Sequence, residues 1–464
     1  MAISAKELPL GKVFTPDFRF TIPSFQRAYI WKTENILQLV SDLDDACKSP
    51  GTPYFLGSLI LVREGDNRYD VIDGQQRLVS LSIIIAVLRD LERDPDLMRQ
   101  LDALLVEPGD KLRGIVTEPR LTLRERDAAF FREHVQEDNL ESVFDMNDDD
   151  LATAAQRNIV ANIRKTYDEI SNWSASERQQ FAQYLVNEVT LVIVTTDDLD
   201  GAHRIFDVMN MRGLPLTPSD VFKARATAGL STAELDVYAA RWDDIIDPLG
   251  DDPHDCEEFF AYLHLVLTHK PATDKLIEDF LADVLQPYID KGTVPTFINQ
   301  VLAPYAMAWR IIARPSDTVL PAEVRSRLEG LDDYRSHEWK PVAMWALVNS
   351  YRGLGDADLS PFVVRASRIA RTTATLESLG AHDERRLLEI LTALEQVTGI
   401  RTLNRTGTLE RRGYANAAIR DLDKGYLVQR VNGLHVSDGD REGALVRLHG
   451  EMQGDGDLVR LLLI

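Results

Sequence analysis

The sequence predicts an α+β protein, with a small mixed-sheet N-terminal domain followed by a mostly α-helical domain. Two observations predict this class. β-Prone stretches with alternating apolar and polar residues or a short apolar run occur at 12–22, 54–72 and 190–195. Apolar residues recur at helical spacing through most of 226–426.

The length also predicts more than one domain. A chain of 464 residues is long for one hydrophobic core. We expect a domain at 1–226, with a helical insertion at about 92–188, and a helical domain at 227–464. The chain ends on the apolar run LVRLLLI, from which we expect a truncation ahead of a further domain.

The composition limits the classes of function. Two cysteines, Cys47 and Cys256, give no disulfide framework. The N-terminus lacks the apolar stretch of a signal peptide and no apolar run is long enough to cross a bilayer, so we expect a cytoplasmic protein without a membrane contact. A net charge of -22 argues against a broadly basic surface for nucleic acid, so DNA contacts would be confined to a local cleft.

The stretch 69–89, YDVIDGQQRLVSLSIIIAVLR, predicts a strand, a tight turn and a helix. Gly74 suits the turn, and the helical spacing begins at Gln76. A helix that starts here directs unpaired N–H groups and its positive dipole end at whatever lies over the turn, which favours an anion. The polar side chains of Asp73, Gln75, Gln76 and Arg77 are not expected to serve packing. A plain turn with a solvated polar cap is the alternative.

A second polar loop precedes the predicted helix that Thr33 is expected to cap. It carries Gln26 and Arg27, with Tyr29 and Trp31 close behind. A Gln-Arg pair beside two aromatic residues suits a phosphate or a nucleotide edge. The alternative is that the aromatic residues pack in the core and Arg27 is solvated.

The remaining elements frame these two loops. We expect a hairpin over 54–72, an amphipathic helix from about Glu125, and an acidic surface connection at 137–150. A later helix–turn–helix segment gathers polar residues around its turn, with Thr217 or Ser219 as the cap of its second helix. These polar residues are Asn210, Arg212, Asp220 and Lys223.

Three motifs together resemble one family. They are IPSFQRAYIW at 22–31, VIDGQQRL at 71–78 and FDVMNMRGLPLTPSDVFK at 206–223. In this order and spacing they resemble the N-terminal domain of GmrSD-type restriction proteins, a branch of the ParB/sulfiredoxin-like superfamily. RLTLRERDAAFF at 120–131 fits the helical insertion of that family. The layout is most similar to the SspE-like phage-defence effectors.

The resemblance implies a ParB-like domain that binds and hydrolyses a nucleoside triphosphate, with GTP expected as the substrate and Mg²⁺ as the cofactor. The catalytic residues would be Asp73, Gln75, Gln76 and Arg77, with Asp73 as the metal ligand. The nucleotide-binding residues would be Gln26, Arg27, Gly74, Asn210 and Arg212. These residue types suit phosphoryl transfer, which depends on positioning and charge stabilisation.

The resemblance also implies partners. The SspE-like branch responds to phosphorothioate-modified DNA, for which Tyr29, Ile30 and Trp31 would line the sensing surface. Hydrolysis would gate a nuclease of the HNH type, on a C-terminal continuation or on a partner chain. Two alternatives stay open: a DNA endonuclease in its own right, and a non-catalytic nucleotide- or DNA-binding module. The sequence does not identify the nucleotide, the DNA mark or the oligomeric state, and a homo-oligomer is compatible with it.

Overall fold

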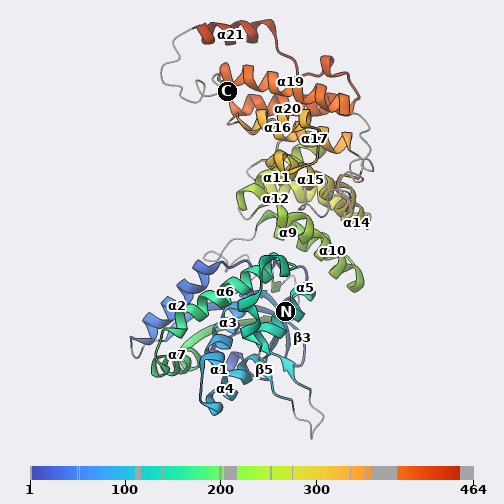
Figure 1. Cartoon of the computed structure of the whole chain (residues 1–464). Helices are drawn as coiled ribbons and strands as arrows, with labels where there is room; N and C mark the ends of the chain where they lie inside the picture. Colours follow the sequence, from blue (N-terminus) through green and yellow to red (C-terminus); the bar gives the residue numbers. More distant parts are fainter. Residues whose placement is uncertain are drawn as a thin grey trace. The chain divides into compact units, whose positions relative to one another are not determined.

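The computed structural model folds as two compact units, residues 1–215 and 216–464 (Figure 1). Each unit has a hydrophobic core of its own. The structure describes residues 3–49, 51, 53–109, 116–137, 139–197, 201–202, 217–250, 253–273, 275–334, 336–351, 353–356 and 384–449. The predicted α+β class is confirmed, because the first unit holds a mixed sheet and the described part of the second is helical.

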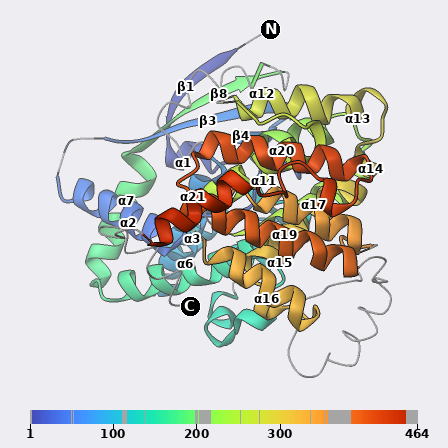
Figure 2. The ribbon, with the colours of Figure 1, turned by 90° about the horizontal axis from the view of Figure 1, so that it is seen from above.

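The first unit is built on a six-stranded sheet in the order β1-β8-β3-β4-β2-β7. Figure 2 shows β1, β8, β3 and β4 side by side in this order. β3 is antiparallel to β4 and parallel to β8, while β2 is parallel to both β4 and β7. The strands are β1 Ser4–Pro9, β2 Arg19–Thr21, β3 Tyr54–Gly65, β4 Arg68–Asp73, β7 Leu121–Thr122 and β8 Val189–Thr196, with β5 Val106–Glu107 and β6 Glu118–Pro119 as a separate pair.

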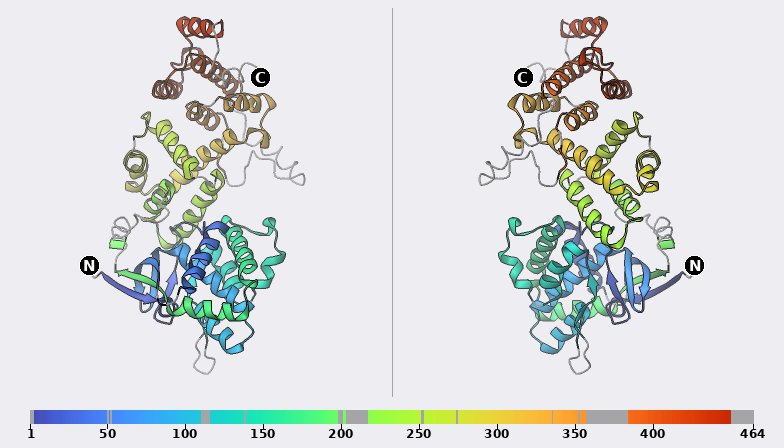
Figure 3. Two further views of the ribbon diagram at one scale, coloured as in Figure 1. Left: turned by 90° about the vertical axis from the view of Figure 1, so that its left-hand side faces the viewer. Right: turned by 90° about the vertical axis from the view of Figure 1, so that its right-hand side faces the viewer.

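Helices of the first unit lie beside this sheet (Figure 3). The most buried of them is α3, Gln75–Leu91, whose residues from Leu78 to Arg89 are all buried. A helix that is apolar nearly all round belongs inside a protein, and α3 lies in the core of this unit. The others are α1 Leu10–Val13, α2 Thr33–Cys47, α4 Pro95–Leu105, α5 Glu125–Phe131, α6 Ala154–Ser171 and α7 Ala175–Asn187.

Several predicted elements are confirmed. The hairpin is β3 and β4, the short buried strand is β8, and the helix from Glu125 is α5. The prediction of an extended segment at 12–22 is wrong in part, because only Arg19–Thr21 is a strand and Lys12 lies in α1. β1 was not expected. The acidic stretch contains two short 3₁₀ turns, Leu140–Asp145 and Asp148–Asp150.

The second unit is helical throughout its described part, as the periodicity predicts. Its first helix, α9, is capped by Thr217, which accepts from the Asp220 N–H at 3.3 Å. No described helix is long and apolar enough to span a membrane. The helices are α9 Pro218–Thr227, α10 Thr232–Ile246, α11 Pro253–Thr268, α12 Leu276–Phe280, α13 Gln286–Asp290, α14 Val294–Phe297, α15 Ala303–Ala313, α16 Ala322–Asp332, α17 Lys340–Ser350, α19 Glu384–Leu403, α20 Thr408–Asp423 and α21 Asp438–His449.

Candidate functional site

The turn between β4 and α3 requires glycine. Gly74 has φ 93°, in the left-handed region, and a Cβ there would overlap the Leu59 side chain. Glycine also carries no side chain that caps α3, so the first-turn N–H groups of Gln75, Gln76 and Arg77 receive no side-chain cap from this residue. The start of α3, one residue earlier than expected, is therefore suited to an anionic group.

A small, narrow pocket with a cavity volume of about 10 Å³ lies beside this turn. It brings together the Gln-Arg loop, the first turn of α3 and the start of α5. Two arginines and one aspartate supply its charge, so its lining carries a net positive charge. The lining residues are Ile22, Arg27, Tyr29, Gln75, Gln76, Val79, Leu123, Arg124 and Asp127.

Two predicted site residues, Gln75 and Arg27, line this pocket with polar groups available to a ligand. Gln75 is 6% exposed, and its Oε1 has no hydrogen-bond partner in the described structure. Arg27 is half-buried and has no ion-pair or hydrogen-bond partner among the described residues. Buried polar groups normally have hydrogen-bond partners, so the Gln75 amide oxygen and the Arg27 guanidinium are groups that a ligand or water in this pocket could satisfy.

Gln76 has a different role from its neighbour. Its Oε1 accepts from the N–H groups of Ile30 at 2.9 Å and Trp31 at 3.3 Å, and its Nε2 donates to the Ala28 carbonyl at 2.9 Å. The expectation that this side chain has no packing role is therefore wrong, because it fixes the Gln-Arg loop to α3. Its predicted catalytic role stays a prediction.

Arg77 and Asp73 contact each other. Arg77 Nη2 lies 3.2 Å from Asp73 Oδ2, and Nη1 donates to the Leu56 carbonyl at 3.3 Å. Gly57 makes room for this guanidinium, because a Cβ there would overlap Arg77 Nη1. The pair ties the start of α3 to β3 and β4, and neither residue lines the pocket.

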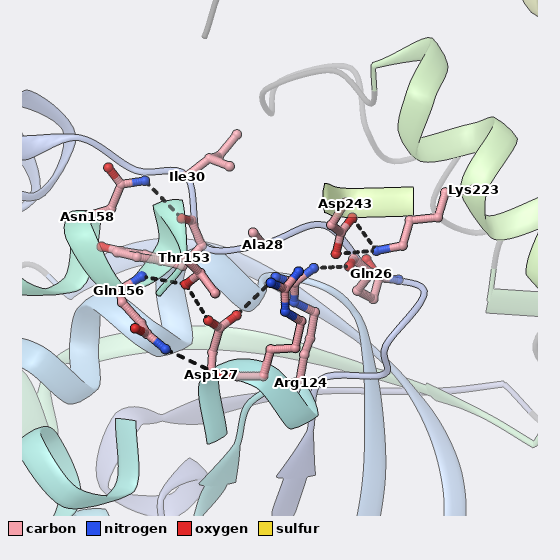
Figure 4. A network of polar contacts seen from close by, with 12 residues as sticks. Gln26, Ala28, Ile30, Arg124, Asp127, Thr153, Gln156, Asn158, Lys223 and Asp243 are labelled. Atoms are coloured by element: carbon pink, nitrogen blue, oxygen red, sulfur yellow. Dashed lines mark hydrogen bonds and ion pairs between the residues drawn. The ribbon is translucent and has the colours of Figure 1, made fainter. Parts of the chain in front are cut away.

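Sequence reasoning missed Arg124 and Asp127, which also line the pocket. Figure 4 shows their side chains pointing toward each other. Arg124 Nη2 lies 3.0 Å from Asp127 Oδ2, and Arg124 Nη1 lies 3.5 Å from the Gln26 carbonyl oxygen. Thr153 Oγ1 donates to Asp127 Oδ1 at 2.7 Å. The spacing R-x-x-D just before a helix was the available signal, since residues three apart are neighbours on a helix.

The residues predicted to sense DNA modification lie at different depths. Tyr29 is 4% exposed and belongs to the core, and Trp31 is half-buried and packs against that core. Ile30 is 38% exposed. Burial raises the pKa of Tyr29, so its hydroxyl stays protonated and bonds Ser80 Oγ at 2.7 Å.

The predicted metal ligand, Asp73, has one cationic partner in Arg77. Within the described residues, no group of three or more His, Cys, Asp or Glu side chains is arranged to hold a metal ion. These residues therefore do not form a preformed all-protein magnesium site. Asn210 and Arg212 lie outside the described residues.

The comparisons with known proteins bear on the same part of the chain. No curated protein matches at a significant level. Residues 10–227 match a family described as GmrSD restriction endonuclease, N-terminal domain, and this range includes the pocket and the turn before α3. This part of the chain is therefore similar to the N-terminal domain of GmrSD restriction endonucleases.

Proposed function

We propose that the first unit binds a nucleoside triphosphate with its phosphates over the first turn of α3, and hydrolyses it. The single observation that carries this proposal is the pocket where Gln75 and Arg27 meet an uncapped helix start. A phosphate there would receive N–H groups and a guanidinium, the donors that phosphates prefer. The six-stranded sheet with a helical insertion is compatible with the ParB-like fold that the motifs imply.

Each residue at the pocket has a proposed part. Arg27 neutralises charge on the transferring group, and Gln75 orients the attacking water through its amide. Arg77 and Gln76 support the site by holding the strands and the loop around it. The predicted contributions of Gln26, Gly74, Asn210 and Arg212 to nucleotide binding belong to the same proposal.

Magnesium would enter this site with the nucleotide. In nucleotide sites Mg²⁺ usually binds phosphate oxygens, water and only one or two carboxylates. Asp73 is the proposed carboxylate. Chelation with EDTA is expected to abolish phosphate release, and undiminished release in EDTA would remove magnesium from the proposal.

We further propose that hydrolysis gates a nuclease in a DNA-modification-linked restriction system, with phosphorothioate as the first mark to test. Ile30 is the exposed member of the proposed sensing surface, with Trp31 beside it. An apolar surface favours sulfur over oxygen, because sulfur is larger and less strongly hydrated. The acidic net charge of -22 fits a concentrated DNA contact rather than a broad one.

The test is phosphate release from GTP, ATP and CTP with Mg²⁺, with and without phosphorothioate duplex. Arg27→Ala and Gln75→Ala are expected to lower kcat/KM by at least about tenfold. Arg68→Ala, at the opposite end of β4, and the exposed Gln183→Ala are matched controls expected to keep the parent rate. Equal rates in all variants would refute the site, and metal-dependent plasmid cleavage by the chain would favour the endonuclease alternative.

One observation favours a second candidate, a nucleotide-binding switch without turnover. Two of the residues predicted to be catalytic, Gln76 and Arg77, already have partners within the fold. A switch needs only the groups that bind phosphate. Tight nucleotide binding with no phosphate release, in the presence or absence of modified DNA, would favour this candidate over the hydrolase.

A further inference from the structure

The loop that carries Arg27 is held by side chains rather than by a strand or helix. On one side of Arg27, the Gln26 carbonyl oxygen lies near Arg124. On the other side, the Gln76 side chain donates to the Ala28 carbonyl and accepts from the N–H groups of Ile30 and Trp31. Because buried backbone groups need partners, these side chains determine where the loop lies.

The helix α6 of the insertion supplies the remaining partners. Asn158 Nδ2 donates to the Tyr29 carbonyl at 3.0 Å, and Asn162 Nδ2 donates to the Trp31 carbonyl at 2.8 Å (Figure 4 shows the Asn158 contact). Asn162 also donates to the Tyr29 hydroxyl at 2.9 Å, and that hydroxyl bonds Ser80 of α3. Two helices, α3 and α6, therefore hold one loop from two directions.

Packing alone does not explain these amides. Asn162 is fully buried between core residues such as Ile159 and Ile163. Its Oδ1 and the Thr166 Oγ1, one turn later, have no hydrogen-bond partner in the part of the chain that is described. Unpaired buried polar atoms lower stability, and an apolar side chain would avoid that cost. What the amides provide is the position of the loop.

We propose that Asn158 and Asn162 are positioning residues, which hold Arg27 over the first turn of α3 so that α6 sets the nucleotide affinity of the pocket. This inference rests on the proposed nucleotide site. A fixed loop lowers the ordering cost of binding, because the Arg27 backbone is already in place when the phosphate arrives. In general, side chains that support the binding residues of a site hold those residues in the geometry that binds the ligand.

The main test is a double-mutant cycle on nucleotide affinity. Asn158→Leu removes the donor at similar size, and we expect it to raise the Kd for GTP, ATP or CTP about tenfold. In an Arg27→Ala background the same change is expected to alter Kd less than about twofold, because the residue acts through Arg27. Asn172→Leu, at the exposed end of α6, is the matched control with parental affinity.

Hydrogen–deuterium exchange supplies a readout that needs no nucleotide. In Asn158→Leu and in Asn162→Ala, the amides of Ile30 and Trp31 are expected to exchange faster than in the parent, while Asn172→Leu leaves them unchanged. Asn162 is fully buried, so Asn158, at the edge of the core with 9% exposure, carries the test if Asn162→Ala does not fold.

The outcomes separate the two proposals. A parent protein that binds no nucleotide overturns the proposed function, and this inference with it. A parent whose affinity depends on Arg27 but not on Asn158 overturns the positioning role alone. An equal loss of affinity for Asn158→Leu in both backgrounds would also overturn it, because that result describes general damage to the fold. Unchanged amide exchange would contradict the loop-holding contacts.

Discussion

The first turn of α3 and the helix α9 both carry residues of the family-like motifs, yet their polar side chains have different surroundings. In α9, Lys223 is 2% exposed and its Nζ lies 2.8 Å from Asp243 Oδ1 on α10. At the first turn of α3, Gln75 is nearly as buried but its Oε1 has no described partner. The motif residues thus divide into those whose polar atoms are paired inside the fold and those with a polar atom that has no described partner.

The largest effect on stability is expected from removing the ion pair between α9 and α10. Asp243→Ala removes the carboxylate that lies 2.8 Å from the buried Lys223 ammonium, and we expect a loss of about 3–5 kcal/mol in the free energy of unfolding. Urea denaturation measures it, with the exposed Lys291→Ala as a control for removing one charge. The double variant Lys223→Met, Asp243→Leu is expected to recover much of the loss. A single variant within about 1 kcal/mol of the parent would contradict the role of the pair.

The next effect concerns the turn before α3. Gly74→Ala combines a left-handed backbone with an overlap with Leu59, so we expect a loss of about 3 kcal/mol in the free energy of unfolding. Gly51→Ala is a close control, because Gly51 has φ 92° but open space around its Cα. It is expected to lose only about 1 kcal/mol. Equal losses at the two positions would show that the contact with Leu59 does not matter.

A smaller effect separates the adjacent glutamines. Gln76→Ala removes the partners of two loop N–H groups and one carbonyl, and is expected to cost about 1–3 kcal/mol of stability. Gln75→Ala removes a side chain whose Oε1 is unpaired, so the free energy of unfolding should stay within about 0.5 kcal/mol of the parent. Thermal and urea unfolding of the two variants compare them directly. The reverse ranking would contradict the assignment of Gln76 to the loop and Gln75 to the ligand.

The smallest effect depends on pH. Burial first, and Glu64 second, raise the pKa of Asp70 to about 6 in the folded protein. A carboxyl with a raised pKa binds more protons in the folded state, so its contribution to stability falls as pH rises from about 4 to about 6. Asp70→Asn should therefore raise Tm by about 2–4 °C at pH 7 and leave it unchanged at pH 4. The same shift at both pH values would exclude titration of Asp70 as the cause.

Much of the fold was accessible from sequence because its signals are local. The alternation at 54–72, the turn glycine Gly74 and the apolar run of α3 each lie within a few residues, and each prediction is confirmed. The strand β1 was not predicted, because its residues are exposed or half-buried and show no alternation of apolar and polar residues. It is held by pairing with β8, far along the chain.

The site was predictable only in part, for the same reason. The sequence pointed to Gln75 and Arg27 by motif, and the structure brings them to one pocket. Sequence reasoning did not separate Gln75 from Gln76, because the partners of Gln76 lie 45 to 48 residues earlier. The contact of Asn158 with Tyr29 spans 129 residues. The ion pair between Arg124 and Asp127 could have been predicted from the sequence, because the two residues are only three positions apart.

The measurement that tests the central claim most directly is the equilibrium titration of GTP, ATP and CTP onto four proteins. These are the parent, Gln75→Ala, Arg27→Ala and the exposed control Gln183→Ala. We predict that the parent and the control bind at least one nucleotide alike, while the two pocket variants bind it at least about tenfold more weakly at unchanged Tm. Equal affinity across all four proteins, or no binding by the parent, would contradict the assignment of this pocket to a nucleotide.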